Sequence, residues 1–265
     1  MIRFVLIPLP LLVLFAVPVA PTPAWSADRM ETLSGRSLQI SGPCARSVTI
    51  RPDPTAHESV RVLARADNPA ELDQLRFRAD GVARIDVPAP RCWRPDGQTS
   101  FSPTLDITVT VPTRMALAIA ESGTGRYDIG DVGGPLSLDG GGAVVIRDEH
   151  VDGLDAELSG QVDLSLQKLT GNASIVMSGS GRTTLDQVDL SRFDLSLSGS
   201  GQVEVGSGTV AHAKIDASGV GRVRVVATVG DADTDVSGAV SVRFARVTGQ
   251  LHREQSGLGS VSVAP

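Results

Sequence analysis

The residues best suited to chemistry gather in two acidic segments. The segment Arg147-Asp148-Glu149-His150-Val151-Asp152 is the densest acidic loop of the chain, and Ca²⁺ prefers carboxylate oxygens as ligands. It lacks the alternating Asp/Asn spacing of a dedicated calcium loop, so the favoured interpretation is a solvated turn. Asp231, Asp233 and Asp235 alternate along one outward strand face, where a solvated edge is favoured. We therefore predict no metal site.

The main catalytic alternative is an enzyme that cleaves polysaccharides. Glycoside hydrolysis needs two carboxylates flanking a bond, usually in a groove, and long insertions would have to build its walls. The repeat described below varies by only three residues in length, and aromatic residues, which would support sugar rings, are 3% of the chain. Gly140-Gly141-Gly142 resembles a phosphate loop, but no helix follows it and no Lys lies nearby, so a bent corner is favoured. None of the four histidines lies at metal or triad spacing. We predict no catalytic residues and no cofactor.

A set of outward arginines is the surface feature with the clearest ligand preference. In the repeat described below, Arg222 occupies the position that is equivalent to Arg182, and Arg224 the position that is equivalent to Arg243. Arg246 lies three residues after Arg243. Guanidinium groups bind carboxylate, sulfate and phosphate oxygens, so this stripe would suit acidic glycans or lipid headgroups. The alternative is that outward acidic residues such as Glu204 simply balance the charge.

Composition excludes several classes of protein. The chain has 265 residues, a net charge of −6 and 41% hydrophobic residues. That apolar content is too high, and the charge too modest, for a disordered chain. A net negative charge with few aromatic side chains argues against nucleic-acid binding.

The N-terminal segment predicts export. Arg3 precedes an apolar run from Phe4 to Ala20, and small residues follow at Ser26 and Ala27. This pattern indicates a secretory signal peptide over residues 1–26, with an uncleaved anchor as the alternative. We expect a periplasmic, secreted or cell-surface protein of the bacterial envelope that does not span the membrane after cleavage. Export permits a disulfide between Cys44 and Cys92, with two separate buried thiols or redox chemistry as the alternatives.

An internal repeat dominates the second half of the chain. A Ser-Gly pair recurs every 17 to 20 residues, and Asp139-Gly140 fills the one missing place. The pairs begin at Ser122, Ser159, Ser178, Ser198, Ser218, Ser237 and Ser256. We call the first residue of each pair a repeat mark. Five and seven residues after each repeat mark the side chains are apolar or aromatic, with Thr183 as the exception, while the intervening residues are largely polar. Alternation of period two predicts strands with one buried face.

These strands cannot bury their apolar faces alone, but stacked repeats can. We therefore predict an all-β, single-stranded parallel β-helix, or β-solenoid, with about 19–20 residues per coil and a right-handed turn. An antiparallel sandwich is the competing fold. It would not require equivalent positions of successive repeats to keep the same residue type, whereas stacked coils do. Regular coils are expected over residues 113–265. Residues 27–112, where alternation is looser, are expected to form N-terminal strands and a cap or irregular early coils.

The last coil breaks the rule, because Arg253 and Gln255 replace inward apolar residues. An open edge of unpaired backbone invites pairing, so self-association through the C-terminal coil is a further hypothesis.

The corner motifs resemble a known family. The strand Leu105–Pro112 and the segments Ser122–Ile129, Ser178–Gly181 and Ser198–Val205 are similar to those of the auto-transporter adhesin head GIN domain, a domain of unknown function in exported bacterial proteins. The resemblance covers roughly residues 38–263 and implies an exported β-helical protein with an adhesive role. It supplies no catalytic residues. Where such domains often carry Asp after the corner, this chain has Arg126, Arg182, Gln202 and Arg222.

Together these features favour a non-enzymatic, exported β-solenoid that acts as an adhesin or an envelope-associated binding protein. The expected partners are a cell-surface glycan, a lipid headgroup or an envelope protein. The alternative is a periplasmic β-helix that binds or modifies polysaccharide.

Overall fold

The computed structural model describes residues 27–42, 45–86, 104–121 and 123–264, and most of them lie in strands. The signal segment and both cysteines, Cys44 and Cys92, lie outside the described residues. One short helix, α1 (Pro69–Leu72), begins after Asn68, whose side chain accepts a hydrogen bond from the Ala70 N–H group. No helix in these ranges has the length and apolar character that crossing a membrane requires.

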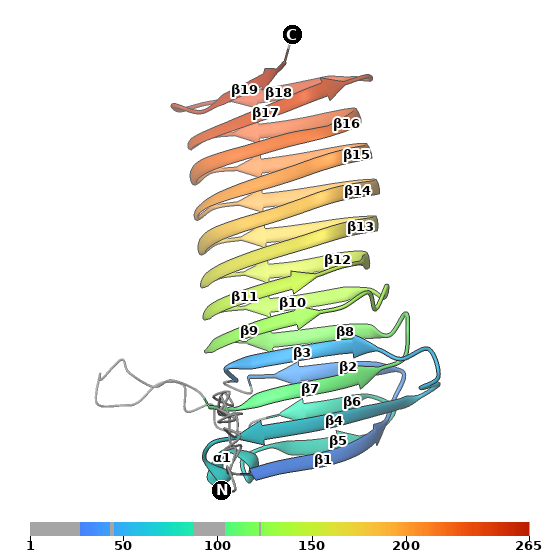
Figure 1. Cartoon of the computed structure of the whole chain (residues 1–265). Helices are drawn as coiled ribbons and strands as arrows, with labels where there is room; N and C mark the ends of the chain where they lie inside the picture. Colours follow the sequence, from blue (N-terminus) through green and yellow to red (C-terminus); the bar gives the residue numbers. More distant parts are fainter. Residues whose placement is uncertain (1–26, 43–44, 87–103, 122, 265) are drawn as a thin grey trace, which may run out of the picture.

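The regular part of the molecule is a stack of parallel strands (Figure 1). Its strands are β8 (Ala116–Glu121), β9 (Thr124–Ile129), β10 (Leu136–Gly140), β11 (Ala143–Asp148), β12 (Val151–Leu158), β13 (Gln161–Met177), β14 (Ser180–Leu197), β15 (Ser200–Ala217), β16 (Val220–Val236), β17 (Ala239–Val247), β18 (Leu251–Gln255) and β19 (Ser260–Val263). Each pairs in parallel with its equivalents in the adjacent coils. Val203 pairs with Val223, and Val223 with Val242, so each coil returns to the same column at the predicted spacing. The predicted β-solenoid and its coil length are confirmed.

The coil is flattened into two broad faces. The first face contains β9, β11, the beginnings of β13 to β16, then β17 and β19. The second face contains β8, β10, β12, the ends of β13 to β16, and β18. Strands β13 to β16 are 17 or 18 residues long and wrap continuously from one face to the other (Figure 1).

The core between the faces consists of stacked columns of inward side chains. One column on the first face holds Tyr127, Ile146, Leu164, Thr183, Val203, Val223, Val242 and Val261, all buried. On the second face, burial alternates with exposure along β10, where Leu136 and Leu138 are buried and Ser137 is exposed. The alternation predicted from the sequence is thus the alternation of the core, because successive side chains of a strand point to opposite sides.

One repeat mark was placed wrongly. Asp139-Gly140 does not occupy the corner of its coil, because the N–H groups of Ser159 and Gly160 both donate to the Gly140 carbonyl. In the next coil Ser178 and Gly179 donate in the same way to Leu158, so Gly140 is equivalent to Leu158. The corner is therefore Gly141-Gly142, two residues later than predicted.

This correction changes which residues of β11 are stacked on the inward columns. Val144, assigned to the column of Leu164, pairs instead with Gly125 and Val162. Ile146 takes the place beside Leu164, and the next inward position falls on Asp148.

The corner glycines are required by close approach. At Gly179, Gly199, Gly219 and Gly238 a Cβ would overlap the backbone carbonyl group of the corner one coil below. None of these four lies in the left-handed region, so the close approach of the neighbouring coil, and not an unusual backbone angle, requires glycine there. Stacked coils about 4.8 Å apart leave no room for a side chain that points along the rod.

The N-terminal strands extend the rod in an order that differs from the chain order. They are β1 (Ala27–Ser34), β2 (Ser37–Ser41), β3 (Ser47–Pro52), β4 (Ser59–Ala66), β5 (Arg76–Ala79), β6 (Ala83–Asp86) and β7 (Asp106–Val111). Strands β2 and β3 form a coil directly against β8 and β9, while β6 and β7 lie on their other side. Beyond these, β4 pairs antiparallel with both β7 and β1, and β5 with β6. These strands form the lower end of the rod in Figure 1, where β7 is green and the others are blue or teal.

Candidate functional site

The arginines singled out from the sequence point outward on the first face. In β16 Val223 and Val225 are fully buried, so the alternating Arg222 and Arg224 are exposed. In β17 the same alternation exposes Ser241 and Arg243. Arg224 and Arg243 are direct neighbours on adjacent strands.

Arg182 and Arg222 lie in the same outward column, but the coil that carries Gln202 lies between them. Arg182 pairs with Gln202, and Gln202 pairs with Arg222. The structure therefore brings together Arg222, Arg224 and Arg243, and leaves Arg182 two coils away. Arg246 of β17 lies beyond the bend, beside Thr228.

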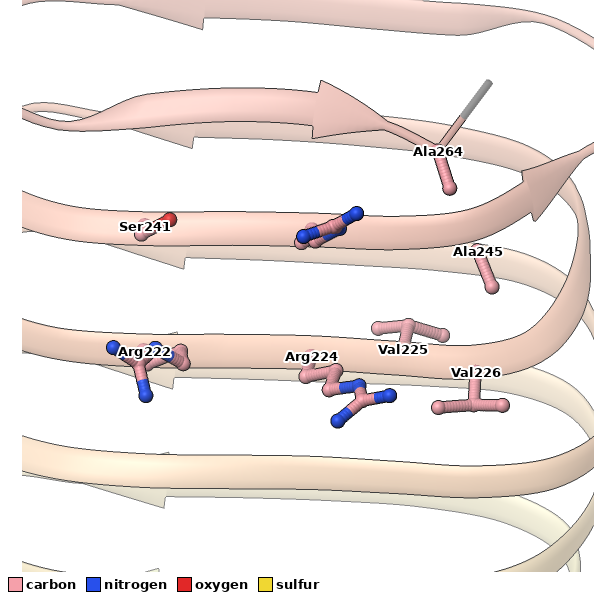
Figure 2. Close-up of a pocket in the computed structure, with 8 residues that line it drawn as sticks. Arg222, Arg224, Val225, Val226, Ser241, Ala245 and Ala264 are labelled. Carbon is pink, nitrogen blue, oxygen red and sulfur yellow. The ribbon is translucent and has the colours of Figure 1, made fainter.

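The three clustered arginines line a groove of about 580 Å³. Its other lining residues are Val225, Val226, Ser241, Ala245 and Ala264. Figure 2 shows Arg222 and Arg224 along one strand, with Ser241 and Ala245 on the strand above and Ala264 above Ala245. The groove exists because these neighbours are short, and because β19 presents Ser262 beside Arg243.

The charge of this groove is only partly balanced. The Arg224 Nη1 atom lies 3.8 Å from Glu204 Oε1 on the neighbouring strand, and both side chains are substantially exposed. Among the described residues, neither Arg222 nor Arg243 has an ion-pair partner within 4 Å. Exposed pairs of this kind contribute little, so the guanidinium groups remain available to an external anion.

The whole first face carries more positive than negative charge, and we call it the basic face. Its outward arginines in the regular stack are Arg126, Arg147, Arg182, Arg222, Arg224 and Arg243. Its outward carboxylates there are Asp128, Asp163 and Glu204.

The acidic segment around His150 matches the expected solvated turn only in part, because Glu149 is exposed between β11 and β12 whereas Asp148 is not. Asp148 is 3% exposed and lies in an inward column between Ile129 of β9 and Leu166 of β13. Its Oδ1 atom accepts a hydrogen bond of 3.0 Å from the His150 N–H group. The pKa of this carboxyl is raised from 3.8 to about 7. Burial is the main cause and the nearby Glu149 and Asp131 add to it, while the backbone hydrogen bonds from His150 and Glu149 oppose the rise. The wrong position assigned to this repeat hid the inward direction of Asp148.

A second buried carboxyl lies near the start of the regular stack. Glu121, at the end of β8, is 2% exposed and accepts hydrogen bonds from the Tyr127 hydroxyl at 2.8 Å and the Gly123 N–H group at 2.9 Å. Burial raises the pKa of Glu121, and these two hydrogen bonds oppose the rise. Both acids point into the core, away from the arginine groove, so neither can act on a ligand bound there.

The remaining candidates from the sequence are the three aspartates of β16 and His150. Within the described residues they do not come together as a metal site. Asp231, Asp233 and Asp235 are exposed on β16, as their spacing predicted. His150 Nδ1 lies 3.1 Å from Asp131 Oδ1. Over the described ranges no group of three or more His, Cys, Asp or Glu residues is arranged to hold a metal ion.

Comparison with known proteins identifies the fold family. A family model described as "Putative auto-transporter adhesin, head GIN domain" matches residues 48–264. The chain belongs to this family. No curated protein matches the sequence.

Solved structures agree on the GIN-domain fold. A putative adhesin from Bacteroides fragilis NCTC 9343 has 14% identity and a TM-score of 0.52, over 90% of this chain and 98% of that one. A putative adhesin from Parabacteroides merdae ATCC 43184 has 11% identity and a TM-score of 0.52, over 91% and 97%. Another, from Parabacteroides distasonis ATCC 8503, has 14% identity and a TM-score of 0.50, over 90% and 97%. At such low identity these likenesses establish the β-solenoid fold alone. The binding chemistry of this GIN domain has to be argued from its own surface residues.

Proposed function

We propose that this protein is a non-enzymatic, exported binding protein of the bacterial envelope, and that it holds an anionic partner in the arginine groove of its basic face. Membership of an adhesin family and the solenoid fold support a binding role. The observation that carries the proposal is the groove itself, which Arg222, Arg224 and Arg243 line together and where, among the described residues, only Arg224 has a carboxylate partner, Glu204.

The spacing of the three guanidinium groups indicates the class of ligand. Arg222 and Arg224 stand two residues apart along one strand, about 6.7 Å at the backbone, and Arg243 is about 4.8 Å away on the next coil. Each guanidinium offers forked donors that fit carboxylate, sulfate or phosphate oxygens. A ligand that presents several such groups on one surface can therefore contact all three. Acidic glycans and anionic lipid headgroups share this chemistry.

The polysaccharide-modifying alternative has less support in this groove. Glycoside cleavage requires two carboxylates on either side of the scissile bond. The residues that line the groove are arginines, small residues and valines, and the two buried carboxyls, Glu121 and Asp148, lie in the core. Binding without catalysis is what this set of side chains can perform.

Binding to defined polyanions tests the proposal. The purified protein is titrated with dextran sulfate, with polygalacturonate, and with vesicles of phosphatidylglycerol or of phosphatidylcholine. We expect binding to at least one anionic probe, weakened by salt because exposed charges are screened. The sulfated polymer, the polyuronate and the anionic vesicle then distinguish the sources of the anion.

Charge reversal locates the binding. Arg222→Glu with Arg224→Glu should weaken binding by about 100-fold, since each lost charge-assisted hydrogen bond costs about 1.5 kcal/mol and about 1.4 kcal/mol is ten-fold. Arg192→Glu with Lys214→Glu reverses the same number of charges on the second face and serves as the matched control. Equal weakening by both pairs, or no binding to any anionic probe, would show that the groove is not the site.

A further inference from the structure

The second face of the rod has the opposite charge. Its outward carboxylates in the regular stack are Asp139, Asp155, Glu157, Asp194, Asp216, Asp231, Asp233, Asp235 and Glu254. Arg192 and Lys214 stand among them, and each lies beside an aspartate of its own strand, at 2.7 Å from Asp194 and 3.4 Å from Asp216. We call this the acidic face.

A single strand carries the centre of both charge clusters. Strand β16 presents Arg222 and Arg224 on the basic face and, after it wraps round the bend, Asp231, Asp233 and Asp235 on the acidic face. All five side chains are exposed. Within the described residues, Asp233 and Asp235 have no ion-pair partner within 4 Å, and Asp231 has only His212, at 3.5 Å. Unbalanced positive and negative groups therefore stand at the same height on opposite sides of the rod.

The two faces also match in periodicity and in size. Both are sides of the same coils, so their charged columns repeat with the same spacing of about 4.8 Å. Eight coils make each face roughly 40 Å long, and six residues of strand make it roughly 20 Å wide. A contact of that size, about 800 Å² per partner, equals a standard stable interface.

The geometry points to a second copy of this chain as the partner of these faces: the basic face of one rod packs against the acidic face of the next, with the rods parallel and their C-terminal coils at the same height. Antiparallel rods would place the arginines of β16 and β17 beside the N-terminal coils instead. The contact is heterologous, because it joins two different faces of the protein. It therefore leaves one free face of each kind and can extend into a row.

The test is self-association of the full protein by sedimentation velocity, at low salt and at about 0.5 M salt, where the Debye length is short. We expect concentration-dependent association at low salt that is lost at high salt. Arg222→Glu with Arg224→Glu should weaken it by about 100-fold, and so should Asp233→Lys with Asp235→Lys, because like charges then oppose each other. Circular dichroism checks that both variants are folded, which is expected because the substituted side chains are exposed.

Mixing the two variants provides the decisive measurement. The first variant keeps a native acidic face and the second keeps a native basic face, so the mixture should form heterodimers although neither variant associates alone. A mixture that stays monomeric would overturn the proposal, as would wild-type protein that stays monomeric at low salt.

Two further results separate this contact from association at the end of the rod and from ligand binding. Leu258 in the last coil is 92% exposed, and association abolished by Leu258→Asp but kept by both face variants would overturn the lateral contact in favour of the C-terminal coil. The acidic-face variant retains the arginine groove, so it should still bind the anionic probes. Failure of the lateral contact is therefore distinguishable from failure of the proposed ligand site.

Discussion

Asp148 should make the protein less stable as the pH rises. Its pKa in the folded protein is about 7, against 3.8 for an unperturbed aspartate, because the carboxyl is buried between Ile129 and Leu166. Between these two values the folded state binds more protons than the unfolded state, and stability falls with pH wherever that holds. The contribution of this group is thus fully present below about pH 4 and is lost as the pH rises through 7.

The size of the effect follows from this rise in pKa. A pKa raised from 3.8 to about 7, at about 1.36 kcal/mol for each pH unit, corresponds to about 4 kcal/mol between pH 4 and pH 8. Asp148→Asn keeps the shape of the side chain, and its amide oxygen can still accept the hydrogen bond from His150. It cannot ionise, so it should lack this pH-dependent loss.

The assay compares the free energy of unfolding of the wild type and of Asp148→Asn by urea denaturation from pH 4 to pH 8. Other carboxyls titrate equally in both proteins, so the difference between them isolates Asp148. We expect the variant to gain about 4 kcal/mol relative to the wild type across this range. Asp155→Asn, which removes an exposed carboxyl from the neighbouring β12, is the control and should show no such trend. A difference that is constant with pH, or that shrinks as the pH rises, would refute the burial argument.

Three other substitutions test the packing of the columns. Thr183 is fully buried and its hydroxyl has no hydrogen-bond partner among the described residues, so Thr183→Val should raise the free energy of unfolding by about 1–3 kcal/mol in the same denaturation assay. Gly221→Ala should lower it by about 3 kcal/mol, because the new Cβ would overlap the Gly201 carbonyl on the coil below. Tyr127→Phe removes the hydroxyl that donates to Glu121, so it should cost about 1–2 kcal/mol, and more above the raised pKa of Glu121 than below it.

Each of these has a matched control. Thr183→Ser keeps the hydroxyl and should not stabilise the protein. Val220→Ala changes an exposed neighbour of Gly221 and should have little effect. A Tyr127→Phe cost that does not grow with pH would contradict the role given to the phenol.

The solenoid could be predicted because its coils repeat both a corner and an alternation. Val203 and Val223 stack as the spacing required, and both are fully buried. The error at Asp139-Gly140 arose because a shift of two residues preserves the alternation, since side chains along a strand repeat their direction every two residues. Only the corner fixes the register, and in this coil the corner is Gly141-Gly142, which lacks the serine that marks the others. The burial of Asp148 was not predicted for the same reason.

The order of the N-terminal strands could not be predicted in the same way. Alternation in β2, β3, β6 and β7 indicates which side chains face the core, but it does not say which strand is the neighbour. Without a constant period, nothing in these segments indicates that β2 and β3 intervene between β6–β7 and the regular coils.

The same distinction separates the charge of a face from the shape of a site. The charge of each face follows from the alternation, since the residues between buried positions must point outward. The groove depends on something else, the length of each outward side chain compared with its neighbours on adjacent coils. Arg222, Arg224 and Arg243 enclose a groove because Ser241, Ala245 and Ser262 beside them are short. At Arg182 the neighbours are Asp163 and Gln202, and the column is filled. A repeat therefore reveals where a basic stripe lies, whereas the place along it where a ligand can enter depends on the residues that interrupt it.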